Sequence, residues 1–156
     1  MRFSVALICM MVVASGCGPS ERKVATEKLL SAKYKDIKAD YIRVLISEGA
    51  DVNARRTDGG TPLMIAAGNS STPEIVQLLL EKGAELEARN TAGWTPLMHA
   101  AQFSSTPEIV QLLLEKGAEV NARSTTGKTP LMRAARNTNG KSAEIKQLLI
   151  DAGAKE

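Results

Sequence analysis

The sequence repeats with a period of 34 residues, and this period constrains the fold more than any other feature of the chain. The segment Thr-Pro-Leu-Met occurs at 61–64, 95–98 and 129–132, and a glycine precedes each copy by two positions. Gly-Ala pairs close the copies, and their glycines are spaced by 34, 34 and 36 residues. A period of about 20 to 50 residues is typical of stacked arrays, in which each repeat buries its apolar face against its neighbours.

Each repeat predicts two helices and a connecting turn. We expect Thr61 to cap the first helix with its hydroxyl and Pro62 to occupy the first helical position, where its missing N–H costs nothing. Thr72 and Pro73 open the second helix in the same way. Apolar residues cover enough of that helix to require burial on two sides, and we expect Gly83 to end it in a left-handed conformation. They are Ile75, Val76, Leu78, Leu79 and Leu80.

These repeats resemble ankyrin repeats, which have a period near 33 and a T-P-L-H-x-A signature. The resemblance runs from residue 21 to residue 156 and implies an all-α solenoid of helix-turn-helix repeats joined by hairpin-like turns. We expect repeats at about 23–53, 54–87, 88–121 and 122–156, with a divergent first copy and a truncated last copy. Met64, Met98 and Met132 stand where the family has its signature His.

The first residues of the chain predict a secretory signal rather than part of the fold. Arg2 precedes an apolar run of about a dozen residues, which is short for a membrane span. The segment 14–17, Ala-Ser-Gly-Cys, resembles the lipobox of bacterial lipoproteins, although Ala14 stands where Leu or Val is commoner. The resemblance implies removal of residues 1–16, lipidation of Cys17, a tether over 17–22 and a repeat domain over 23–156. An ordinary cleaved signal with an incidental Cys is the alternative.

Location follows from the same segment. A lipidated Cys17 implies a chain anchored by lipid to the bacterial envelope, and Gly18 after the Cys favours the outer membrane, facing the periplasm. Cys9 would be lost with the signal, so no thiol would remain for a disulfide or a metal site.

The composition and motifs disfavour several function classes. The net charge is only +3, whereas dedicated nucleic-acid binders carry a clustered basic face. Gly127-Lys128-Thr129 resembles the end of a phosphate loop, but Ala122 stands where that pattern needs Gly. His99 is the only His, so neither a zinc site nor a catalytic triad is favoured. We therefore expect no catalytic residues, no metal, no cofactor and no small-molecule substrate.

A comparison of repeats within the chain locates the expected binding face. Residues 54–87 and 88–121 are identical at 26 of 34 positions, and six of the eight differences lie in the turn or the first helix. In the ankyrin family that surface is the usual recognition face. Candidate partner-binding residues there are Arg56, Asp58, Trp94, His99, Phe103, Lys128, Arg133 and Arg136.

The aromatic candidates allow two interpretations. His99 and Phe103 are four residues apart, hence on one helix face, and Trp94 lies just before that helix. Together they predict an aromatic anchor patch for a partner protein, because aromatic residues and Arg dominate interface hot spots. Alternatively, Trp94 packs on a neighbouring turn and Phe103 fills a gap between repeats.

The leading hypothesis is therefore a non-catalytic protein-binding module held at the envelope by lipid. A second hypothesis is a structural envelope component. It rests on Arg55, Arg89 and Arg123, which recur once per repeat and would bind peptidoglycan or lipid headgroups.

Overall fold

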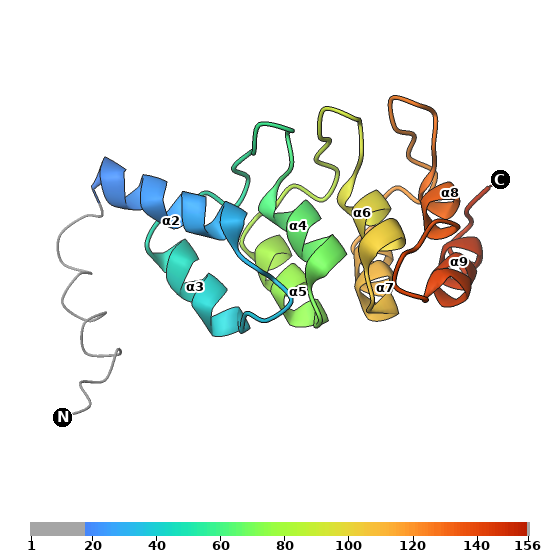
Figure 1. The fold of residues 1–156 in the computed structure, drawn as a ribbon, viewed down its shortest axis with the longest axis horizontal. Coiled ribbons are helices and arrows are strands. Elements are labelled where there is room, and N and C mark those ends of the chain that lie inside the picture. The colour runs from blue at the N-terminus through green and yellow to red at the C-terminus, as the bar shows by residue number, and fades with distance from the viewer. Residues whose placement is uncertain (1–17, 156) are drawn as a thin grey trace.

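The computed structural model describes residues 18–155, and these fold into helices stacked in pairs along one axis (Figure 1). Among the described residues there are eight helices and no strand, which confirms the all-α solenoid. In chain order they are α2 (Pro19–Ser31), α3 (Ala39–Ser47), α4 (Pro62–Asn69), α5 (Pro73–Glu81), α6 (Pro96–Phe103), α7 (Pro107–Glu115), α8 (Pro130–Ala134) and α9 (Ser142–Asp151).

The pairs form two layers. Helices α4, α6 and α8 lie side by side in one layer, and α3, α5, α7 and α9 form the other (Figure 1). The turns that precede α4, α6 and α8 all project from the same edge of the stack. Backbone hydrogen bonds join successive turns: Thr91 N donates to Asp58 O at 3.0 Å and Thr125 N donates to Ala92 O at 3.1 Å. The loops therefore form a continuous rim beside α4, α6 and α8, which we call the inner helices.

The first helix of each repeat begins as its sequence predicts. The Thr61 hydroxyl accepts a hydrogen bond from Met64 N at 3.4 Å, and Thr95 and Thr129 cap α6 and α8 at the same distance. Pro follows each Thr at the first helical position, where its fixed φ suits the helix. Gly83 has a φ of 87° just after α5, so the left-handed helix end is also confirmed.

The second helix of each of the two middle repeats, α5 and α7, begins at the predicted proline but without the predicted side-chain cap. Neither Thr72 nor Thr106 caps its helix with its side chain. The buried Ser70 hydroxyl instead donates to Thr72 O at 2.8 Å and accepts from Thr72 N at 3.3 Å. Ser104 and Thr106 repeat this arrangement. The inter-helix loop is therefore held by the serine. Thr72 occupies the N-cap position of α5, but the prediction that its hydroxyl caps the helix was wrong.

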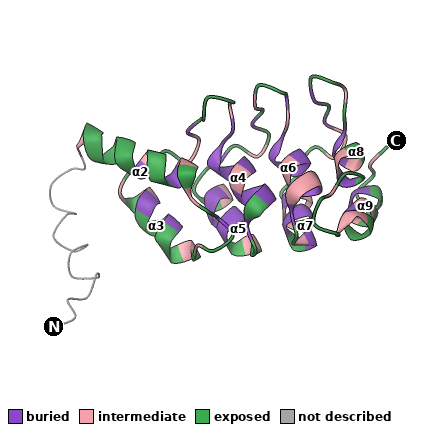
Figure 2. Cartoon of the chain, in the orientation of Figure 1, coloured by how far each residue is buried: buried purple, intermediate pink, exposed green. Residues whose placement is uncertain are grey.

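The core is aliphatic and lies where the helices meet. Ile75, Val76, Leu78 and Leu79 of α5 are each no more than 2% exposed, as expected for a helix covered on two sides. Figure 2 shows this burial concentrated in the central pairs, whereas α2 is largely exposed. Met64 and Met98 are fully buried at the position of the signature His. An apolar side chain therefore packs where the family has a polar one.

The two ends of the array differ from its middle. Residues 19–22, which the sequence assigned to a tether, form the first turn of the 13-residue helix α2. At the other end Met132 and Ile150 are 37% and 51% exposed, which suits helices that no further helix covers within residues 18–155. Residues 1–17, which include the predicted signal and Cys17, lie outside the described residues. No helix between residues 18 and 155 has the length and apolar character that a membrane span requires.

Candidate functional site

Three side chains of the third repeat form an aromatic cluster on the inner-helix face. Trp94 ends the turn before α6, whereas His99 and Phe103 lie one helical turn apart on α6. The Trp94 ring centroid is 5.2 Å from that of His99 and 5.9 Å from that of Phe103, and His99 and Phe103 are also 5.9 Å apart. All three side chains are half-buried. The structure thus brings together the aromatic residues that the sequence predicted to form a patch.

Arg133 of the next repeat covers this aromatic cluster. Its guanidinium carbon lies 3.7 Å from the Trp94 ring centroid, within the range of a cation–π contact. Its Nη1 also donates to Gln102 Oε1 at 3.5 Å, and its Nε is buried without a hydrogen-bond partner. Burial lowers the pKa of Arg133, and the neighbouring charge of Arg136 lowers it further. Arg133 is therefore a cation whose hydrogen-bonding capacity the protein does not fill.

Phe103 also contributes to packing between repeats. Gly68 of α4 faces it so closely that a Cβ added at Gly68 would lie 3.3 Å from Phe103 Cβ. Gly68 corresponds to Gln102 one repeat later, so the small residue makes room for the ring. The two interpretations of the aromatic residues are therefore compatible, because the same ring packs on its neighbour and leaves part of its surface exposed.

His99 is uncharged at neutral pH. Burial lowers its pKa from 6.5 to about 4, Asp58 opposes that shift, and Arg133 adds to it. Its Nε2 is buried with no hydrogen-bond partner. Under physiological conditions the aromatic cluster thus presents apolar ring surface, and the positive charge nearby comes from arginine and lysine.

Two hollows flank the aromatic cluster, one on each side. The first, which we call the mixed hollow, measures about 270 Å³ and carries both signs of charge. Its lining is Arg56, Asp58, Gly60, Met64, Ile65, Asn69, His99 and Phe103. The second, the basic hollow, measures about 310 Å³ and is lined by Thr126, Lys128, Met132, Arg133 and Arg136. Of the eight predicted partner-binding residues, seven line these hollows and Trp94 stacks against Arg133 beside them.

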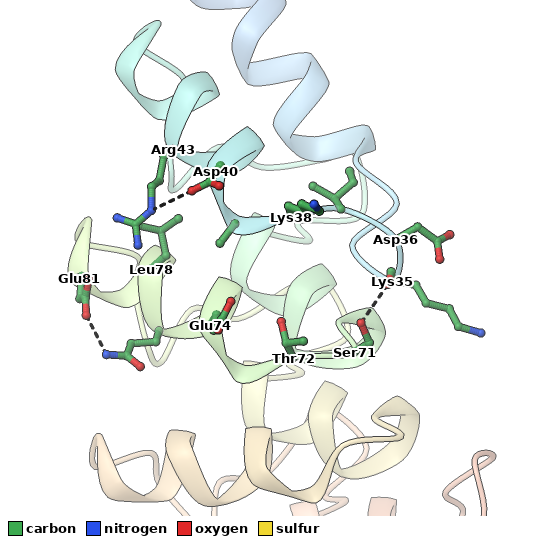
Figure 3. A pocket seen from close by; sticks show the side chains of 13 residues that line it. Lys35, Asp36, Lys38, Asp40, Arg43, Ser71, Thr72, Glu74, Leu78 and Glu81 are labelled. Carbon is green, nitrogen blue, oxygen red and sulfur yellow. Dashed lines mark hydrogen bonds and ion pairs between the residues drawn. The ribbon is translucent and has the colours of Figure 1, made fainter. Parts of the chain in front are cut away.

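A larger hollow of about 620 Å³ lies between α3 and α5 and was not anticipated from the sequence. Figure 3 shows charged side chains of both signs around it, with Arg43 beside Asp40 and the Ser71 hydroxyl bonded to Lys35 O. Because its charges alternate and partly neutralise one another, it favours no single ligand chemistry. The divergent first repeat builds one wall, so the comparison between the regular repeats could not reveal it.

The arginine ladder serves a structural role. Arg55 Nη1 donates to Arg89 O at 2.8 Å, and Arg89 Nη1 donates to Arg123 O at 2.7 Å, each across one repeat. Arg55 and Arg89 also pair with Glu85 and Glu119 near the end of their own repeats, at 3.2 and 3.8 Å. The guanidinium groups thus tie neighbouring turns together. Arg123 bonds only within its own turn, to Gly127 O, and binding of peptidoglycan or lipid headgroups by this row stays a prediction.

Over residues 18–155, no three His, Cys, Asp or Glu side chains lie close enough together to hold a metal ion. Around the aromatic cluster the charged side chains are instead those of Arg56, Asp58, Lys128, Arg133 and Arg136. Such an arrangement can bind another molecule by stacking, charge and shape.

The comparison with protein families agrees with this architecture. The family model described as ankyrin repeats, in three copies, matches residues 29–124 and 89–156, which together exceed half of the chain. No curated protein matches the chain. Stacked helix pairs, Thr-Pro helix starts and a projecting rim of turns all belong to that architecture, and the chain is a member of the ankyrin-repeat family.

Proposed function

We propose that this protein is a non-catalytic binding module whose partner protein contacts the aromatic cluster and the two hollows beside it. Ankyrin repeats are generally protein–protein interaction modules. The observation that carries the proposal is the Arg133–Trp94 stack, which holds a half-exposed aromatic and a half-exposed arginine in contact on the inner-helix face. Aromatic residues and Arg are the types that most often provide the energy of protein interfaces.

The rigidity of the cluster supports this proposal. Trp94, His99 and Phe103 touch one another, and Arg133 is held by Trp94 and Gln102. Side chains already fixed in this way lose little rotamer freedom when a partner binds, whereas ordering a mobile side chain costs about 0.5–1.5 kcal/mol. The surface is therefore prepared for recognition before the partner arrives.

Site-specific photo-crosslinking tests the proposed face. We expect a photoreactive amino acid at Asn69, an exposed residue of the mixed hollow, or at Lys128 of the basic hollow to crosslink a protein in an envelope extract. The same probe at Gln111, exposed on α7 in the other layer, serves as the control. Crosslinking should be lost when Trp94 and Phe103 are both changed to Ala while circular dichroism stays helical. Equal crosslinking from Gln111, or loss of helicity in the double variant, would contradict the proposal.

The second part of the proposal is the place where the module acts. We propose that lipid on Cys17 anchors it to the bacterial envelope, in the outer membrane facing the periplasm. The support is the lipobox-like segment 14–17 and the apolar run before it. Labelled palmitate should be incorporated into the wild-type chain and into Cys9→Ala but not into Cys17→Ala. Label retained in Cys17→Ala would refute the anchor and would leave the binding face unaffected.

A further inference from the structure

We propose that the basic hollow receives a carboxylate from an acidic segment of the partner protein, with an apolar residue of the same segment covering Met132 and Trp94. This inference rests on the proposed protein-binding function and adds the chemistry of the partner. Its evidence is the set of unpaired cations, their geometry and the charge of the surrounding face.

The cations of the basic hollow have no counterions within the described part of the chain. The ion pairs among residues 18–155 involve the cations Arg43, Arg55, Arg89 and Lys141, all of which lie outside the basic hollow. By contrast, Lys128, Arg133 and Arg136 lie around one space of about 310 Å³, and none of its lining residues is acidic. The mixed hollow contains Asp58, and the hollow between α3 and α5 contains acidic side chains from both helices. The basic hollow thus differs from these two in carrying a single sign of charge.

The surroundings of Arg133 compensate its positive charge poorly. Its Nε is buried and has no partner, and Nη1 makes only a long bond to Gln102. The lowered pKa of Arg133 reflects burial and the repulsion from Arg136. An anion placed between Arg133 and Arg136 would counter both effects, because a guanidinium and a carboxylate form strong charge-assisted hydrogen bonds.

The surroundings favour a protein segment over a free anion. Met132, which lines the hollow, is 37% exposed, and the Trp94 ring stacks against Arg133. An apolar side chain next to the carboxylate would cover this surface and so gain free energy from its burial. The segment that fits best therefore has an acidic residue followed or preceded by an aliphatic one.

The rest of the face disfavours uniformly anionic partners. Asp58 lines the mixed hollow, and Glu27 lines a further hollow between α2 and α4 that also contains Arg56 and Ile65. These carboxylates would be repelled by a nucleic-acid backbone or an anionic membrane surface. A protein segment can instead place single charges of either sign opposite each hollow.

Two synthetic peptides of equal length test the inference with the full-length chain in mild non-ionic detergent. One alternates Leu and Glu, and the other has Gln in place of every Glu. Anisotropy of a label on the peptide reports binding. We expect the Leu-Glu peptide to bind at least about tenfold more tightly than the Leu-Gln peptide, and to weaken as salt rises.

Variants locate the bound peptide. Arg136→Gln and Lys128→Gln should each weaken binding of the Leu-Glu peptide several-fold and leave the affinity for the Leu-Gln peptide unchanged. Within residues 18–155 neither side chain makes a hydrogen bond or an ion pair, so both variants are expected to keep the wild-type helix content. Lys116→Gln, which removes an exposed cation at the end of α7, is the matched control and should change neither peptide.

Three outcomes of the peptide measurements would overturn the inference. They are equal affinity of the two peptides, no effect of Arg136→Gln, and no binding of the Leu-Glu peptide even at millimolar concentration. Inorganic phosphate and phosphatidylglycerol vesicles form a further arm. If either one binds, loses binding in Arg136→Gln and is not displaced by the Leu-Glu peptide, then the site recognises phosphate and the inference fails. If the two peptides bound equally while a probe at Asn69 still crosslinked a partner, the acidic segment would be refuted and the proposed function would stand. If no crosslink formed, the proposed function itself would be refuted.

Discussion

The guanidinium carbon of Arg133 lies 3.7 Å from the centroid of the Trp94 ring, although the two residues belong to different repeats. Trp94 ends the turn of the third repeat, and Arg133 lies on α8 of the fourth. The contact therefore joins two repeats at the centre of the candidate binding face. Its residue types distinguish this part of the solenoid from the regular copy before it, where Gly60 stands at the place of Trp94.

Removing the arginine should expose the indole. Trp94 is the only Trp in the chain, so intrinsic emission reports on this site alone. We expect Arg133→Ala to shift the emission maximum to longer wavelength and to lower the free energy of unfolding by about 0.5–1 kcal/mol, the size of a partly exposed cation–π contact. Arg136→Ala, which removes a neighbouring charge that does not touch the ring, is the control. An unchanged emission spectrum in Arg133→Ala would show that the stack does not persist in solution.

Stability should depend on pH through His99. Burial lowers its pKa from 6.5 to about 4, with Asp58 and Arg133 as the charged groups that face it. Between these pH values the unfolded chain binds more protons than the folded one. The free energy of unfolding therefore falls as the pH drops from 6.5 to 4, with up to about 3 kcal/mol coming from this residue.

A variant at the same position isolates that contribution. Ile65 occupies the equivalent place in the second repeat, so His99→Ile puts a residue there that the fold already accommodates. Urea unfolding followed by circular dichroism should show the variant losing less stability than the wild type between pH 6.5 and pH 4. If the free energy of unfolding fell equally with pH in the two proteins, the pKa of His99 would not be lowered by folding.

Much of the fold could be predicted because each signal repeats. Thr61 and Pro62 predict the start of α4 from local geometry alone, and the same signal recurs at α6 and α8. The aromatic cluster could also be predicted from the sequence, because Trp94, His99 and Phe103 differ from the residues at the same places in an otherwise nearly identical copy. Repetition thus separates the residues that build the array from those that vary on its surface.

Other features depend on partners distant in the sequence. The arginine ladder uses acceptors 34 residues away, so a single repeat gives no sign that Arg55 bonds to the Arg89 carbonyl. The loop before α5 differs for a local reason, because Ser70 holds Thr72, two residues away, in part-buried hydrogen bonds that replace the expected side-chain cap. Finally, residues 19–22 contain Pro19 and polar side chains that suit a tether, yet they extend α2.

The ladder can be tested by comparing two of its members. Arg89→Ala removes a 2.7 Å bond to Arg123 O in the next repeat and an ion pair to Glu119, whereas Arg123 Nη1 bonds only within its own turn, to Gly127 O at 3.1 Å. We expect Arg89→Ala to cost about 1–2 kcal/mol of stability, as for a charged hydrogen bond that is partly exposed, and Arg123→Ala to cost less. The measurement is the urea midpoint. Equal losses in the two variants would argue against a role in joining repeats.

A pair of glycines separates backbone strain from crowding between turns. Gly93 and Gly127 have nearly the same left-handed φ, 70° and 73°, at equivalent places in successive turns. A Cβ at Gly93 would lie 2.8 Å from Thr125 N, the atom that donates to Ala92 O, whereas a Cβ at Gly127 would meet nothing within 4 Å. Gly127→Ala should therefore cost only the left-handed strain, about 1–2 kcal/mol.

Gly93→Ala should cost more, because the new methyl group must also displace the backbone of the next turn. We expect an additional loss of about 1–3 kcal/mol, the usual range for overpacking, seen as a lower urea midpoint. The displaced turn ends at Lys128 and leads into α8, so Trp94 emission should shift in Gly93→Ala and stay unchanged in Gly127→Ala. If the two variants lost the same stability, the contact between successive turns would be loose enough to absorb a methyl group. The rim could then not be the element that holds the aromatic cluster and the basic hollow in register.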